Sequence, residues 1–120
     1  MRVLDVGCGS GDVAFLAADL VGPTGEVIGA DRAAEAAQRA TARAQARDLQ
    51  NVKFLEGDPT EMQFDRPFDA VIGRLVLMYY PDPVDAVLRL ASKVGLGFRR
   101  APTHNTRFAT VTSRDPQWID

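Results

Sequence analysis

The N-terminal stretch VLDVGCGSGD constrains the fold of this chain of 120 residues more than any other segment. Residues 3–6 form a short, mostly apolar run that stops at glycines, which is typical of a strand buried inside a parallel sheet. Gly7, Gly9 and Gly11 follow at alternate positions, and their missing side chains let the backbone bend sharply and approach a ligand closely. The apolar residues within 12–21 favour a helix directly afterwards. The sequence therefore predicts a strand, a tight glycine turn and a helix, with a ligand against the turn.

Strands and helices continue to alternate through most of the chain. The predicted segments are strands over 27–30, 52–55 and 68–72 and helices over 32–49 and 82–93. Strands separated by helices imply right-handed βαβ units, so the expected fold class is α/β, a Rossmann-like, doubly wound parallel sheet. We predict the strand order 3-2-1-4 with room for a fifth strand next to the fourth. Residues 108–112 are the one strand-like run later in the chain.

Composition indicates a folded domain in a reducing compartment. Hydrophobic residues make up 46% of the chain and charged residues 25%, as in ordinary soluble globular proteins. The one cysteine, Cys8, has no partner for an intramolecular disulfide, so we expect a cytoplasmic protein. No apolar run approaches the roughly 20 residues of a membrane span, and we expect no contact with a membrane.

Charge is unevenly distributed along the chain, although the net value is only -2. Acidic residues outnumber basic ones as far as residue 92, and basic residues prevail after it. The acidic part offers no electrostatic footprint for a nucleic acid and the basic part is short, so no nucleic-acid partner is expected. The composition also changes after Val94. We therefore divide the chain into a core over 1–94 and a divergent C-terminal segment over 95–120.

Three carboxylates lie at or near the carboxyl ends of predicted strands, the edge where ligands gather in such sheets. The glycine spacing G-x-G-x-G differs from the G-x-G-x-x-G of pyrophosphate-binding turns. Asp5 comes just before the turn, and its negative charge suits an ammonium group better than a pyrophosphate. Asp31 ends the second strand, where it can accept hydrogen bonds from ribose hydroxyls or cap the next helix. Asp58 follows the third strand and can accept a hydrogen bond from an exocyclic amine such as that of adenine, or simply form an Asp turn.

The segments VLDVGCGSGD, VIGADR, FLEGDPTEMQF and FDAVIGRLVLMYYPDP together resemble the consecutive motifs of class I S-adenosylmethionine-dependent methyltransferases. The resemblance covers about residues 2–94. It implies transfer of a methyl group from S-adenosylmethionine to a small-molecule acceptor. It also implies that the cofactor-binding residues are Asp5, Gly7, Cys8, Gly9, Ser10, Gly11, Asp31, Arg32, Gly57, Asp58, Pro59, Gly73 and Arg74.

The resemblance gives these residues separate roles. The glycine turn and Asp5 would surround the methionine part of the cofactor, Asp31 would hold the ribose, and Asp58 with Pro59 would border the adenine. Gly73 and Arg74, just past the fourth strand, would lie near the methionine end of the cofactor and the acceptor.

No catalytic residue or metal ligand is predicted. The sulfonium already activates the methyl group, so positioning dominates the reaction and a general base is needed only if the acceptor must lose a proton. His104 is expected on the surface, Cys8 is expected to be a packing residue rather than a nucleophile, and at least one of Tyr79 and Tyr80 is expected to pack against the helix that follows.

The chain departs from the family at both ends. Members usually carry helices before the first strand and complete a seven-stranded sheet, so we expect a chain shortened at both ends, with a segment after residue 94 that resembles a shifted reading frame. An open sheet edge would let a second copy pair as a homodimer. Two other functions fit the sequence: an inactive cofactor-binding remnant or interaction module, and a fragment of an NAD-dependent oxidoreductase.

Overall fold

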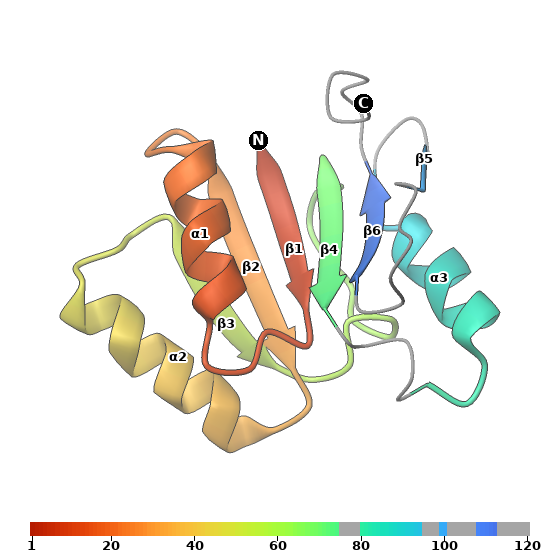
Figure 1. Cartoon of the computed structure of the whole chain (residues 1–120), viewed down its shortest axis with the longest axis horizontal. Helices are drawn as coiled ribbons and strands as arrows, with labels where there is room; N and C mark the ends of the chain where they lie inside the picture. The colour runs from red at the N-terminus through yellow and green to blue at the C-terminus, as the bar shows by residue number, and fades with distance from the viewer. Residues whose placement is uncertain (75–79, 95–98, 101–107, 113–120) are drawn as a thin grey trace.

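The computed structural model describes residues 1–74, 80–94, 99–100 and 108–112. Figure 1 shows its strands and helices in one layered unit. The strands are β1 (Arg2–Val6), β2 (Glu26–Asp31), β3 (Val52–Glu56), β4 (Ala70–Arg74), β5 (Arg99–Arg100) and β6 (Phe108–Thr112). The helices are α1 (Asp12–Val21), α2 (Ala34–Ala46) and α3 (Pro83–Ala91).

The strands form one sheet in the order β3-β2-β1-β4-β6-β5. β1 pairs in parallel with β2 and β4, and β2 pairs in parallel with β3, which confirms the predicted order 3-2-1-4. β6 lies next to β4, where room for a fifth strand was predicted, and it runs antiparallel. One strand was expected after residue 94, but the short β5 pairs antiparallel with β6 as well. Two residues are too few to give a sequence pattern.

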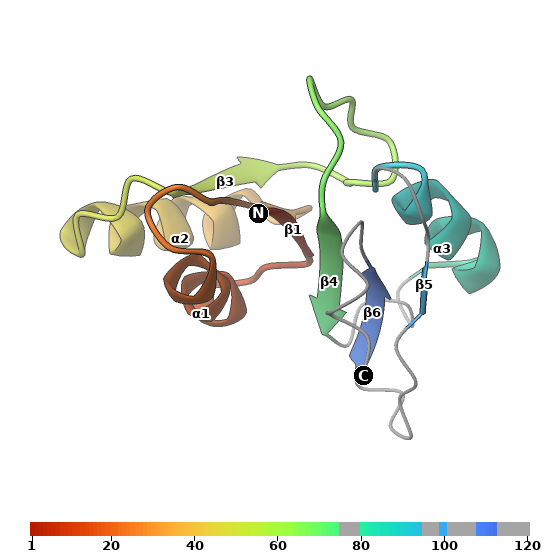
Figure 2. The ribbon, with the colours of Figure 1, turned by 90° about the horizontal axis from the view of Figure 1, so that it is seen from above.

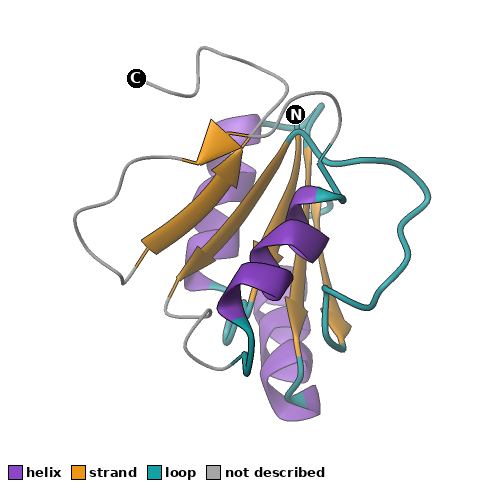
Figure 3. Cartoon of the chain, turned by 90° about the vertical axis from the view of Figure 1, so that its right-hand side faces the viewer, coloured by secondary structure: helices purple, strands orange, loops and turns teal. Residues whose placement is uncertain are grey.

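Helices cover both faces of the sheet, as expected for a doubly wound fold. Figure 2 shows α1 and α2 on one face and α3 on the other, and Figure 3 shows α3 in front of the fanned strands. Alternate residues of β1 serve the two faces: Val3 packs with α1, whereas Leu4 and Val6 pack with Leu90 of α3. Because β1 is covered on both sides, all five of its residues are buried.

Five predicted boundaries were wrong by two or three residues, and local contacts explain some of them. α2 begins at Ala34 rather than 32 because the Asp31 side chain accepts the Ala33 N–H at 2.8 Å and holds a turn there. It ends before Asp48, which has a left-handed φ of 53°. β4 begins at Ala70 rather than 68, and α3 ends at Ala91 rather than 93. β4 also runs on through residues 73 and 74, which were expected to lie just past it.

The carboxyl ends of the four parallel strands point to the lower edge of the sheet in Figure 1, where the glycine turn runs. Loops at this edge are where a parallel sheet binds ligands. Within the described ranges, no helix has the length and apolarity needed to cross a membrane.

Candidate functional site

Backbone hydrogen bonds join the loops that follow the first three strands. The N–H groups of Gly7 and Cys8 donate to the Ala30 carbonyl at 2.8 and 3.1 Å, and the Gly57 N–H donates to the Asp31 carbonyl at 2.8 Å. Because β1, β2 and β3 are neighbours in the sheet, these bonds hold the glycine turn beside the ends of β2 and β3. The residues predicted from these separate segments therefore share one edge.

Asp31, the last residue of β2, fixes the glycine turn with its side chain. Its Oδ2 accepts the Gly9 N–H at 2.9 Å and its Oδ1 accepts the Ala33 N–H at 2.8 Å. α2 takes Ala33 as its N-cap without a side-chain cap, so Asp31 closes the turn before the helix rather than capping it. A carboxylate offers about four lone-pair sites. The Asp31 carboxylate therefore keeps acceptor capacity for hydroxyl groups of a ligand.

Two glycines of the turn meet different surroundings. At Gly9, which has a φ of 55°, an added Cβ would meet nothing within 4 Å. At Gly11, with a φ of 97°, it would lie 3.0 Å from Phe54 and 3.1 Å from Phe15. Gly11 is therefore required by close packing inside the protein, whereas the backbone at Gly9 borders open space that a ligand can fill.

Asp5 holds an unpaired carboxylate oxygen inside the site. The residue is only 2% exposed, and its Oδ2 has no hydrogen-bond partner among the residues that the structure describes. Burial, together with the nearby charge of Asp31, raises the pKa of Asp5 to about 7. An unsatisfied buried acceptor costs free energy unless a donor reaches it. A cationic donor such as an ammonium group would supply both the hydrogen bond and the opposite charge.

Cys8 lies in the glycine turn and is buried against β2, as its expected packing role requires. It is 8% exposed, and its Cβ would lie 2.9 Å from a Cβ added at Gly29. Burial and the charges of Asp5 and Asp31 raise the pKa of the Cys8 thiol to about 12. The thiolate is the reactive form of cysteine, so a thiol kept neutral at physiological pH is a poor nucleophile.

Asp58, after β3, lies in a cluster that the sequence predicted only in part. Its Oδ1 accepts hydrogen bonds from Thr60 N–H at 3.0 Å, Thr60 Oγ1 at 2.8 Å and the Tyr80 hydroxyl at 2.9 Å. Its Oδ2 accepts a hydrogen bond from Arg32 Nη2 at 2.9 Å. The Arg32 guanidinium also lies 4.7 Å from the centroid of the Tyr80 ring. Partial burial works to raise the pKa of Asp58, but these hydrogen bonds and the arginine charge outweigh it and hold the pKa low.

The remaining predicted residues lie at or near this edge. Gly73 pairs with Val6 in the sheet register, which places it beside the start of the glycine turn. Pro59 is buried directly after Asp58. The backbone of Arg74 ends β4, but its side chain, like Tyr79 and His104, lies outside the described residues.

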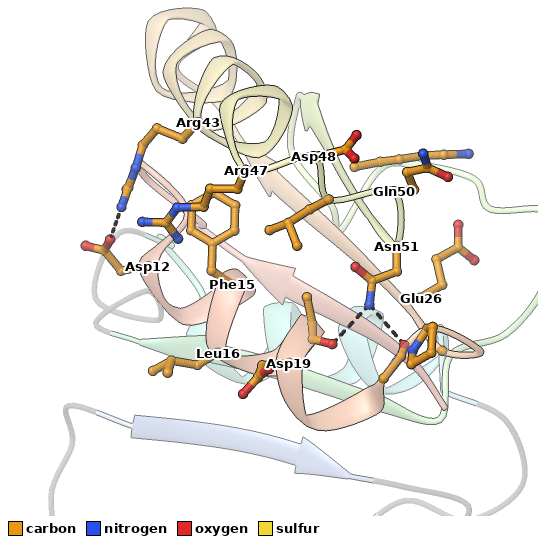
Figure 4. Close-up of a pocket in the computed structure, with 16 residues that line it drawn as sticks. Asp12, Phe15, Leu16, Asp19, Glu26, Arg43, Arg47, Asp48, Gln50 and Asn51 are labelled. Atoms are coloured by element: carbon orange, nitrogen blue, oxygen red, sulfur yellow. Dashed lines mark hydrogen bonds and ion pairs between the residues drawn. The ribbon is translucent and has the colours of Figure 1, made fainter.

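Sequence reasoning missed Arg43 of α2, which supports the glycine turn from behind. Its Nη1 donates to the Ser10 carbonyl at 2.7 Å, and its Nη2 lies 2.9 Å from Asp12 Oδ1. Figure 4 shows Arg43 pointing to Asp12 and Arg47 lying by the ring of Phe15. Arg43 lies far from the turn in sequence, and an Arg in a helix rich in Ala and Arg gives no signal of such a contact.

A groove of about 1060 Å³ lies between α1 and α2 (Figure 4). Asp12, Arg43 and Asn51 are among its lining residues, but Asp5, Asp31 and Asp58 are not. The groove is therefore separate from the site at the carboxyl edge. Among the residues that the structure describes, no group of three or more metal-ligating side chains comes together.

Comparison with known proteins agrees with this fold. A family profile described as "Methyltransferase domain" matches residues 1–114. The chain therefore belongs to this methyltransferase domain family.

Individual relatives make the comparison more specific. Over 103 residues the chain is 39% identical to aklanonic acid methyltransferase DauC of Streptomyces sp. (strain C5), covering 85% of this chain and 47% of the relative. Over 97 residues it is 41% identical to 2-phytyl-1,4-naphtoquinone methyltransferase of Synechococcus elongatus, covering 78% and 40%. The crystal structure of CrArsM, an arsenic(III) S-adenosylmethionine methyltransferase from Chlamydomonas reinhardtii, superposes with a TM-score of 0.70 at 32% identity, covering 79% of this chain and 35% of that one. The chain thus spans less than half the length of these relatives.

Proposed function

We propose that this chain binds S-adenosylmethionine at the carboxyl edge of β1, β2 and β3, and that it serves methyl transfer to a small-molecule acceptor. The observation that carries the proposal is the buried Oδ2 of Asp5 beside the glycine turn, which has no partner within the described part of the chain. This oxygen suits the ammonium group of a methionine moiety, and it would be repelled by the pyrophosphate of a dinucleotide. The residues present therefore fit this cofactor better than they fit NAD.

The proposed residue roles follow the order of the strands. Asp5 and the turn from Gly7 through Cys8, Gly9, Ser10 and Gly11 would hold the methionine moiety. Asp31 would accept hydrogen bonds from the ribose, while Arg32, Gly57, Asp58 and Pro59 would border the adenine. Gly73 and Arg74 would lie toward the acceptor. The cofactor supplies a methyl group already activated by its sulfonium. The contribution of this chain is to orient that group and to exclude water around it.

The proposed acceptor is a small molecule. Two relatives support this class by their names, since they are methyltransferases of aklanonic acid and of a phytyl naphthoquinone. Membership of a methyltransferase family disfavours the NAD-dependent oxidoreductase. The alternative that remains is an inactive cofactor-binding protein. Such a protein would bind the cofactor but would methylate no acceptor in a panel.

We further propose the division of the chain that its composition suggests. Residues 1–94 would form the cofactor-binding core and 95–120 a divergent segment. A cytoplasmic location agrees with the single buried thiol. We also propose a homodimer formed through an open sheet edge, because an unpaired edge strand can pair with a strand of a second copy.

Isothermal titration calorimetry on the 120-residue chain tests the cofactor assignment directly. S-adenosylmethionine and S-adenosylhomocysteine should bind with micromolar affinity, and NAD should bind more weakly. Preferential binding of NAD would contradict the assignment. If a chain with normal far-UV circular dichroism bound neither sulfur ligand, the motifs would support the fold without binding the cofactor.

A further inference from the structure

One oxygen of the carboxylate expected to recognise adenine is already filled by donors from the protein. Asp58 accepts hydrogen bonds from Thr60 N–H, Thr60 Oγ1, the Tyr80 hydroxyl and Arg32 Nη2. Each carboxylate oxygen has two lone pairs, so the three donors on Oδ1 fill it, whereas Oδ2 accepts from Arg32 and keeps one site. An exocyclic amine that binds Oδ1 must therefore replace one of the three donors there.

Tyr80 is the donor that a nucleobase can best replace. The two Thr60 donors belong to the same turn as Asp58, and their bonds are made within two residues. Tyr80 instead reaches Asp58 from 22 residues away in the chain, from the segment between β4 and α3. Its side chain carries the same two features as adenine, a flat aromatic face and a hydrogen-bond donor at its rim.

Both features of Tyr80 are in use. Its hydroxyl donates to Asp58 at 2.9 Å, and the Arg32 guanidinium lies 4.7 Å from its ring centroid. Burial and the hydrogen bond to Asp58 raise the pKa of Tyr80 to about 12, so the hydroxyl stays protonated and remains a donor at neutral pH. Arg32 and Asp58 are the residues that the proposed function assigns to the base.

We propose that Tyr80 occupies the place of the cofactor's adenine when no cofactor is bound, and that the adenine displaces its side chain on binding. This proposal rests on the proposed function, because it assumes an adenine at Asp58. It makes Tyr80 a determinant of cofactor affinity. Each binding event must break the Tyr80 contacts before the adenine contacts can form.

Two substitutions separate the contacts of Tyr80. Tyr80→Phe keeps a ring for Arg32 and removes the hydrogen bond to Asp58, whereas Tyr80→Ala removes both contacts. A hydrogen bond to a charged group is worth enough to change an equilibrium roughly tenfold. Calorimetry should therefore show adenosine and S-adenosylhomocysteine binding about tenfold more tightly to Tyr80→Phe than to the unsubstituted chain, and at least as tightly to Tyr80→Ala.

Inosine is the matched control ligand, because it carries a carbonyl where adenosine carries the amine. It cannot donate to Asp58 at that position and should gain little from either substitution. Unchanged or weaker adenosine binding by Tyr80→Phe would overturn the proposal, as would an equal gain for inosine.

The result also separates this proposal from the proposed function. If the unsubstituted chain binds S-adenosylhomocysteine and the Tyr80 variants bind it with the same affinity, only the role of Tyr80 is overturned. If none of the three chains binds a sulfur ligand while their far-UV circular dichroism is normal, both proposals are overturned.

Discussion

At the scale of single residues, Asp31 has a structural role and a proposed binding role in one carboxylate. It accepts the Gly9 N–H at 2.9 Å, so it shapes the turn beside the proposed ribose site. Asp31→Ala should weaken binding of S-adenosylhomocysteine by about 1–3 kcal/mol, because ribose hydroxyls and a backbone donor lose their acceptor. Calorimetry measures the affinity, and far-UV circular dichroism should show an unchanged fold.

Asp31→Asn is the matched control for this substitution. It keeps one carbonyl acceptor, so its loss of affinity should lie between zero and that of Asp31→Ala. If Asp31→Ala bound the ligand normally, the carboxylate would be a turn residue and nothing more.

Asp5, the proposed ammonium-binding residue, also affects the stability of the ligand-free chain. Its folded pKa of about 7 lies above its ordinary value of 3.8. The folded state therefore holds the proton more tightly than the unfolded state, so the stabilisation is fully present below pH 3.8 and is lost as the pH rises through 7. Between pH 5 and pH 8 this single group should lower the free energy of unfolding by about 2–3 kcal/mol.

Urea denaturation of the ligand-free chain and of Asp5→Asn at both pH values measures this contribution. The neutral amide should remove the loss, so the variant should gain stability over the original chain as the pH rises. It should also bind S-adenosylmethionine less tightly, because the ammonium loses its counter-charge. Parallel pH profiles for the two chains would contradict the assignment of Asp5.

At the scale of elements, α2 stabilises the glycine turn through one of two similar arginines. Arg43 and Arg47 both lie over the Phe15 ring, at 5.0 and 4.5 Å from its centroid. Only Arg43 is seen to hold the Ser10 carbonyl and Asp12. Arg43→Ala should therefore weaken cofactor binding roughly tenfold by loosening the turn, as expected for a lost charged hydrogen bond.

Arg47→Ala serves as its control. It removes the same kind of ring contact and should leave the calorimetric affinity within about twofold, below the effect of one net hydrogen bond. Equal losses for the two variants would show that packing on Phe15, rather than support of the turn, controls binding.

The same scale shows what local sequence can and cannot predict. The four parallel strands followed from apolar runs and intervening helices, because each of these signals lies within one segment. Their order relates distant segments and was predicted together with the resemblance to a methyltransferase family. The carboxylates at the strand ends followed from the same pattern. The contacts of Arg43 with Ser10 and of Tyr80 with Asp58 could not be predicted, because they join side chains that are distant in sequence. The antiparallel direction of β6 could not be predicted either, because the pattern of residues within one strand does not indicate which strand it pairs with or in which direction.

At the scale of the whole molecule, the two edges of the sheet have different tasks. The carboxyl edge carries the turns and the unpaired oxygen of Asp5, whereas the amino edge is closed by a network around Arg2. The Arg2 side chain is about 10% exposed and pairs with Glu26 at 3.1 Å and Asp65 at 2.9 Å. It also donates to the Arg66 carbonyl and lies 4.4 Å from the centroid of the buried Phe68 ring.

This arrangement predicts that stability and binding can be changed separately. Arg2→Ala should lower the free energy of unfolding by about 3 kcal/mol, the lower end for a broken buried ion pair, because Asp65 is largely exposed. The affinity for S-adenosylhomocysteine should not change under conditions where both chains are folded, because Arg2 lies at the opposite edge from the site. Urea denaturation and calorimetry measure the two effects independently.

Arg66→Ala is the matched control, since Arg66 also contacts Glu26 and Asp65 but has a 66% exposed side chain. Exposed ion pairs contribute about 0–1 kcal/mol, so this variant should be nearly as stable as the original chain. If Arg2→Ala were equally mild, burial of the guanidinium at the amino edge would not be what stabilises the fold. If Arg2→Ala instead weakened binding in the folded chain, the two edges would be coupled through β1, and the separation of tasks would be wrong.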